Sequence, residues 1–131
     1  MSPEKLLRLL LYLLSIHSIF VGLALISTPG DMFAYFGYQP VSERFFPIQG
    51  GVFHIVMGVA YYLAAKSINK DHNLILLTII AKLSATIFLI SYFLFIQQIW
   101  MVLVSGIVDA LMAIVVIYVF QEFKKDKNIK L

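Results

Sequence analysis

The sequence predicts an all-α membrane protein, an antiparallel four-transmembrane-helix bundle with a short interfacial helix between the first two spans. Hydrophobic residues make up 61% of the 131 residues and charged residues only 13%, whereas soluble domains average about 45–50% and about 25%. The mean hydropathy is +0.92. Four apolar segments, at about residues 6–27, 46–65, 74–95 and 100–120, each reach the roughly 20 residues that cross a bilayer.

Short connections between these segments indicate one domain over residues 1–131. We expect the first segment to be a retained helix rather than a cleaved signal peptide, because Leu25-Ile26-Ser27 fits a small-residue cleavage site poorly. The chain has no cysteine, which excludes disulfides, thiolate catalysis and Cys-ligated metals.

The basic residues are distributed unevenly between the two ends of the predicted bundle. With four spans, both termini and the middle loop share one side, which carries eight of the ten lysines and arginines: Lys5, Arg8, Lys66, Lys70, Lys124, Lys125, Lys127 and Lys130. The opposite side carries only Arg44. This asymmetry predicts that both termini lie in the cytoplasm, and we expect the membrane to be a bacterial inner membrane. We expect the basic tail at residues 124–131 to meet anionic lipid headgroups, with no nucleic-acid partner.

The loop at residues 28–40 differs from the other connections. Pro29 and Gly30 break the first helix, Asp31 can cap a short new helix, and Gly37 can end it. This piece is largely apolar, with Met32, Phe33, Tyr35 and Phe36, so it is expected to lie in the membrane interface. It either simply covers the bundle or forms a lid over a lateral or outer access to it.

One ionisable side chain falls on each of the four spans, at nearly the same depth: His17, His54, Lys82 and Asp109. A rise of about 1.5 Å per residue places all four at roughly 12–18 Å from the cytoplasmic edge. Ionisable groups are expensive in hydrocarbon and seldom lie there without a partner or a function. Lys82 and Asp109, on consecutive antiparallel helices, are predicted to form an ion pair.

Small or hydroxyl-bearing residues one turn away indicate that three of these side chains face neighbouring helices. Gly50 and Gly58 flank His54, Thr78 and Thr86 flank Lys82, and Ser105 and Ala113 flank Asp109. Leu13 and Val21 flank His17, so its neighbours do not indicate which way it faces.

The polar layer has a structural and a functional interpretation. In the structural one, the Lys82–Asp109 pair fixes the helix register and the histidines bond to neighbouring helices. In the functional one, the four side chains bind the polar head of a lipophilic ligand. Arg44 and Gln49, near the start of the second span, then line an outer mouth, although such residues also serve as headgroup anchors.

Two cofactor alternatives involve the histidines. His17 and His54, on two helices at one depth, are candidate axial ligands of a b-type haem, since imidazole is a common haem ligand. A zinc site from these histidines and Asp109 is chemically allowed, but no short ligand spacing supports it, and we expect no metal.

The chain resembles the DoxX-like small four-helix membrane proteins. The similarity lies in the Pro-initiated aromatic segment that ends in Phe36-Gly37, in the Gly50-Gly51 start of the second span with Gly58 beyond, and in Asp109 in the fourth span. The resemblance implies a four-helix membrane subunit, which in some members is associated with quinone-linked or sulfur-linked oxidoreductases. It carries no catalytic residue over to this chain.

These observations predict a small integral membrane protein that binds a lipophilic ligand in its bundle or serves as an accessory subunit of a larger membrane complex or a homo-oligomer. The alternative is a membrane enzyme for a lipid-soluble substrate such as a quinone or isoprenoid, with Asp109 as acid or base and Lys82 or a histidine tuning it. Proton or ion passage has less support, because the layer is one tier deep.

Overall fold

The structure, a computed structural model, describes residues 1–128 of the chain. It contains four long helices and one short 3₁₀ helix: α1 (Pro3–Ser27), η1 (Gly30–Phe36), α2 (Phe45–Ser67), α3 (Asn73–Phe95) and α4 (Trp100–Asp126). All four long helices are long and apolar enough to cross a membrane. The predicted fold class is therefore confirmed.

The helix ends follow the local sequence, and all except the end of α4 lie within three residues of the predicted spans. The Ser2 hydroxyl accepts a hydrogen bond from the Lys5 N–H, and Pro3 begins α1, a position where its missing N–H costs nothing. The Asp71 side chain accepts from the Asn73 N–H at the start of α3. α4 continues to Asp126, so residues 124–126 of the expected tail are helical, while residues 129–131 lie outside the described part of the chain.

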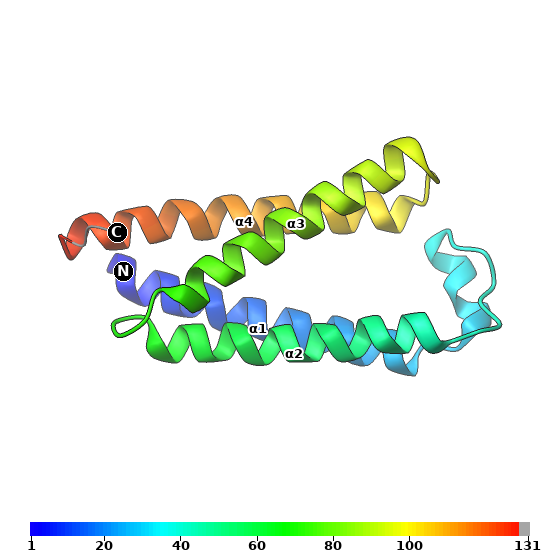
Figure 1. Ribbon diagram of the computed structural model, residues 1–131, viewed down its shortest axis with the longest axis horizontal. Coiled ribbons are helices and arrows are strands. Elements are labelled where there is room, and N and C mark those ends of the chain that lie inside the picture. The colour runs from blue at the N-terminus through cyan, green and yellow to red at the C-terminus, as the bar shows by residue number, and fades with distance from the viewer. Residues whose placement is uncertain (129–131) are drawn as a thin grey trace.

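The helices form two antiparallel hairpins, α1 with α2 and α3 with α4 (Figure 1). Contacts within each hairpin are more extensive than those between the hairpins, which run mainly from α1 to α4 and less from α2 to α3. The N-terminus and the described end of α4 lie at the same end of the molecule (Figure 1), as four spans require. We call this the terminal end, and the opposite one the η1 end.

The hydrophobic core lies in the half of the bundle next to the terminal end. Its fully or nearly buried members come from all four helices: Leu7, Leu11, Leu14, Tyr61, Ala64, Ala65, Ile68, Ile75, Val116, Val119, Phe120 and Phe123. Toward the η1 end the two hairpins move apart (Figure 1). The bundle is thus closed by side-chain packing at one end and open between the hairpins at the other.

Glycines allow α1 and α2 to approach closely along their length. A Cβ atom added at Gly51 would lie 2.6 Å from the backbone oxygen of Gly22, closer than packed atoms can approach. Further along, the Ser15 hydroxyl donates to the Gly58 carbonyl at 2.7 Å. Small residues of this kind let membrane helices pack backbone against backbone, which explains why this hairpin stays closed where the two hairpins separate.

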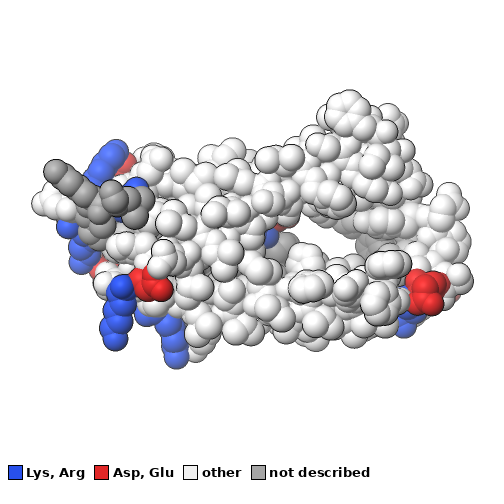
Figure 2. All heavy atoms as spheres, viewed as in Figure 1, with Lys and Arg blue, Asp and Glu red and all other residues white. Residues whose placement is uncertain are grey.

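Charged groups gather at the terminal end, and few lie at the η1 end (Figure 2). At the terminal end, the Glu4 carboxylate accepts hydrogen bonds from Arg8 at 3.2 Å and from Asn69 at 2.8 Å, and it forms an ion pair with Lys127 at 3.1 Å. These contacts join the first turn of α1 to the α2–α3 connection and to the end of α4. We call this group of four side chains the Glu4 junction.

The loop after α1 forms the expected short helix, but as a 3₁₀ helix. The expectation that Asp31 caps it was wrong: η1 already begins at Gly30, and no side chain caps it. Gly37 ends η1 as predicted, with a φ of 87°, in the left-handed region that glycine adopts without strain. A Cβ atom at Gly37 would lie 2.8 Å from Trp100 Cδ1, so η1 reaches across to the start of α4.

Candidate functional site

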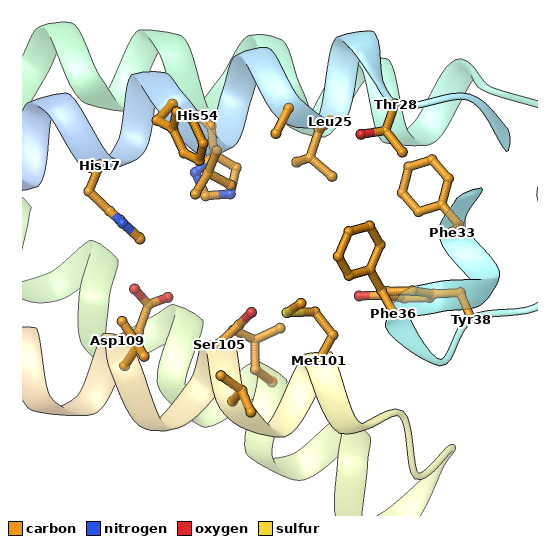
Figure 3. A pocket seen from close by; sticks show the side chains of 16 residues that line it. His17, Leu25, Thr28, Phe33, Phe36, Tyr38, His54, Met101, Ser105 and Asp109 are labelled. Carbon is orange, nitrogen blue, oxygen red and sulfur yellow. The ribbon is translucent and has the colours of Figure 1, made fainter. Parts of the chain in front are cut away.

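A cavity of about 430 Å³ lies between the hairpins in the half of the bundle next to η1. Figure 2 shows this part of the molecule hollowed where the hairpins separate. Sixteen side chains line it, mostly from α1, α4 and the η1 segment (Figure 3): His17, Phe20, Val21, Ala24, Leu25, Thr28, Phe33, Phe36, Tyr38, His54, Leu89, Met101, Val104, Ser105, Val108 and Asp109. Its volume falls within the range of small-molecule sites.

The ion pair that the sequence predicted lies at the inner end of the cavity. Lys82 Nζ donates to Asp109 Oδ1 at 2.6 Å, and the two side chains are only 5% and 13% exposed. Asp109 lines the cavity, whereas Lys82 lies behind it, outside the cavity wall. The Lys82 ammonium also lies 5.7 Å from the ring centroid of the buried Tyr61, at the distance of a cation–π contact.

Both histidines of the predicted polar layer line the same end of the cavity. His17 points across it toward Asp109 (Figure 3), which answers the question of orientation that its neighbours in the sequence left open. His54, from α2, lies against α1: the Ser18 hydroxyl is 3.4 Å from its Nδ1 and donates to its backbone carbonyl at 2.8 Å. Three helices therefore bring two imidazoles and one carboxylate to the same end of the cavity.

Aromatic side chains from the η1 segment close the other end. Phe33, Phe36 and Tyr38 face into the cavity, with Thr28 at the end of α1 beside them (Figure 3). Phe33 is buried and packs edge-on against Tyr38, with ring centroids 6.0 Å apart. Burial, with a smaller contribution from Tyr92, raises the pKa of Tyr38 above its usual value, so this phenol stays neutral at physiological pH.

The remaining two predicted site residues lie elsewhere. Neither Arg44 nor Gln49 belongs to the cavity wall, and Gln49 is exposed. Arg44 Nη2 donates to the Ile26 carbonyl at 2.6 Å, near the end of α1, where backbone carbonyls lack helical partners. The guanidinium thus holds the loop against α1 instead of lining an outer mouth.

Some residues of the site were not identified from the sequence. Ser18, Tyr38 and Met101 were not singled out, and Ser105 was noted only as a neighbour of Asp109. The spacing of Ser15 and Ser18, three residues apart on one face of α1, is a usable signal, because both hydroxyls bond to α2 carbonyls. Tyr38 follows the helix-ending Gly37, and only the folded loop turns its ring into the cavity.

The arrangement bears on the cofactor alternatives as well. Within residues 1–128, no three His, Cys, Asp or Glu side chains lie close enough together to hold a metal ion, so the geometry does not support zinc at His17, His54 and Asp109. The two candidate haem ligands share the cavity, but the Asp109 carboxylate lies in the same wall. A haem held by two histidines does not need a carboxylate at this position.

No protein-family model, curated protein or solved structure matches this chain.

Proposed function

We propose that this membrane protein binds a small amphipathic molecule in the cavity between its hairpins. One observation carries the proposal: the cavity has its two histidines and its carboxylate at the inner end and is apolar along most of its remaining wall. Ligand sites typically combine an apolar lining with a few convergent polar groups. The ligand head would lie near His17, His54 and Asp109, and its apolar body among side chains such as Phe20, Leu25 and Met101.

Access from the bilayer supports a lipid-soluble ligand. The hairpins separate along helices that are long and apolar enough to cross a membrane (Figures 1 and 2), so a molecule dissolved in the hydrocarbon would reach the cavity without crossing water. The α1 stretch from His17 to Thr28 spans roughly 16 Å at about 1.5 Å per residue, which suits an extended molecule. The η1 segment acts as the lid over the other end.

We also propose a membrane, an orientation and a family for the protein. The protein would lie in a bacterial inner membrane with the terminal end on the cytoplasmic side, as the charge asymmetry favours. It would belong with the DoxX-like small membrane proteins and serve either alone or as the ligand-binding subunit of a larger membrane complex.

Photolabelling tests the binding proposal. A twelve-carbon alcohol with a diazirine in mid-chain is added to the protein in phosphatidylcholine nanodiscs, and labelled peptides are identified by mass spectrometry. We expect labelling of cavity residues on α1, α4 and η1. Val108→Trp, which fills the cavity, should abolish it, whereas Ile107→Trp, at the neighbouring and exposed position on α4, should leave it unchanged. Equal labelling in the two variants would refute a ligand site in the cavity.

A second candidate function is catalysis on a lipid-soluble substrate such as a quinone or isoprenoid. It is favoured by the acid–base groups at the position of the ligand head, where His17 faces Asp109 (Figure 3). Asp109 would then transfer a proton, with Lys82 holding the carboxylate in place. Conversion of farnesol or a short-chain quinone by purified protein would be followed by mass spectrometry. Asp109→Asn, assayed where the variant is still folded and its cavity peptides are still labelled by the diazirine alcohol, should not convert the substrate; conversion by this variant would refute the role.

A further inference from the structure

The polar groups at the inner end of the cavity determine which head group it accepts. We infer that the cavity selects an uncharged head that donates a hydrogen bond, the hydroxyl group of an alcohol, over a head that only accepts hydrogen bonds and over an anion or a cation. This inference rests on the binding function proposed above and defines its ligand class.

His54 offers the ligand a hydrogen-bond acceptor. The Ser18 hydroxyl has one proton, and it donates this proton to the His54 carbonyl at 2.8 Å. The same oxygen lies 3.4 Å from Nδ1 of the His54 ring, where it can then only accept, which favours the tautomer with the ring hydrogen on Nδ1. In a neutral imidazole the other nitrogen is an acceptor. No described residue bonds to that Nε2 atom, and His54 lines the cavity.

Asp109 offers a second acceptor. Its Oδ1 receives the hydrogen bond from Lys82, and no side chain in residues 1–128 donates to its other oxygen. An ionised carboxylate only accepts hydrogen bonds. A hydroxyl at this end of the cavity would therefore find an acceptor for its proton, either His54 Nε2 or this carboxylate, and its oxygen could accept from an N–H of the His17 ring. The Ser105 hydroxyl, one helical turn before Asp109, can donate or accept a hydrogen bond, so it does not distinguish one ligand head group from another.

The charges exclude ionised heads. None of the sixteen residues that line the cavity is a lysine or arginine, so a carboxylate or phosphate would meet the negative Asp109 with no cation facing it. The Lys82 ammonium is 5% exposed and already bound to Asp109. An ammonium head would add an uncompensated charge, since the Lys82–Asp109 pair is neutral as a whole. An unpaired charge at this depth is strongly unfavourable.

The test compares four diazirine probes with the same twelve-carbon chain: the alcohol, its methyl ether, the carboxylic acid and the amine. Labelling of cavity peptides in nanodiscs is measured against probe concentration and corrected by subtracting the labelling of Val108→Trp. We expect half-maximal labelling by the alcohol at a concentration roughly tenfold lower than by the ether, the effect of one hydrogen bond to a charged or buried acceptor. The acid and the amine should label more weakly still.

Two variants and their combination link this selectivity to the named acceptors. His54→Phe retains a flat ring but removes Nε2, and Lys82→Met combined with Asp109→Leu removes the second acceptor without leaving an unpaired charge. Because a hydroxyl has one proton, either variant alone leaves it one acceptor and should reduce the preference for the alcohol only in part. The combination of all three replacements should bring the alcohol and ether within about threefold of each other. Unchanged selectivity in the combined variant would overturn the assignment of these acceptors.

The outcomes separate the inference from the function beneath it. If all four probes label the cavity peptides equally, or the ether or acid labels better than the alcohol, the cavity binds amphiphiles but the inferred selectivity is overturned. If no probe labels cavity peptides above the Val108→Trp background, the binding function itself fails, and the inference fails with it.

Discussion

Breaking the Lys82–Asp109 pair should destabilise the bundle strongly. The perturbation is Asp109→Asn, which preserves the shape of the side chain and removes its charge. The Lys82 ammonium is then left in an almost fully buried position, where its only described ion-pair partner is Asp109. The cost comes from the charge that remains, because a buried ion without a counter-ion loses its hydration and gains nothing in exchange.

The magnitude follows from the geometry. At a separation of 2.6 Å and an effective dielectric constant of about 20, the attraction between the two charges is about 6 kcal/mol. Part of this is offset in the native protein by the cost of removing both ions from water. Loss of one partner from buried pairs costs about 3–5 kcal/mol, and we expect Asp109→Asn to lower the free energy of unfolding by that amount.

Reversible unfolding in mixed micelles measures this difference. The pair of Lys125 with Glu122 supplies the matched control: its separation is 2.7 Å, but its side chains are 72% and 39% exposed. Lys125→Met should have no measurable effect, since solvent screens surface pairs. The combined replacement Lys82→Met with Asp109→Leu should restore stability to near that of the native protein, because no charge is left unpaired.

An unchanged free energy of unfolding for Asp109→Asn would refute the reasoning. It would mean that the ammonium finds water or another partner in the cavity. Failure of the double replacement to restore stability would show instead that these side chains contribute through packing or other contacts, not through their mutual charge.

Three further outcomes follow from other contacts. Gly51→Ala should lower the free energy of unfolding by about 1–3 kcal/mol, because its Cβ would collide with the Gly22 carbonyl. The control Gly50→Ala should be neutral, since its Cβ would meet only one side-chain atom, at 3.9 Å. Equal effects of the two replacements would contradict this helix contact. Arg44→Met removes the hydrogen bond to the end of α1, and amide exchange in the loop at residues 28–44 should become roughly tenfold faster; unchanged exchange would count against that anchor. Glu4→Gln should speed amide exchange in the last turn of α4 at low salt and much less at 1 M salt, where the screening length falls to about 3 Å; a salt-independent effect would argue against charge as the cause.

Composition and spacing were sufficient to predict the bundle and its ion pair. Four apolar segments of spanning length leave few alternatives in a bilayer, where every backbone polar group needs an internal partner. Lys82 and Asp109 were then paired by depth alone, because two opposite charges at one level on consecutive antiparallel helices have a strong reason to meet. The prediction needed no knowledge of how the helices tilt.

The cavity could not be predicted, because it depends on where the helices are not in contact. The sequence is apolar along the whole of each span, and nothing in the residues facing the η1 end distinguishes a separated pair of hairpins from a packed one. Gly22 and Gly51 show the same limit, since their close contact depends on the rotation of α1 against α2. Arg44 was placed at a mouth by its position in the chain, whereas the folded loop directs its guanidinium to the Ile26 carbonyl.

The separation of the hairpins makes the molecule a wedge. Its helices are packed together where the core lies and stand apart at the η1 end (Figure 1), so it occupies a larger cross-section in the leaflet that contains η1 than in the other. A wedge fits best in a bilayer bent toward the opposite side, and a flat membrane must compress the lipids around its wide end. Lateral pressure in that leaflet would therefore act to push the hairpins together, and this would couple the width of the cavity to the composition and curvature of the surrounding membrane.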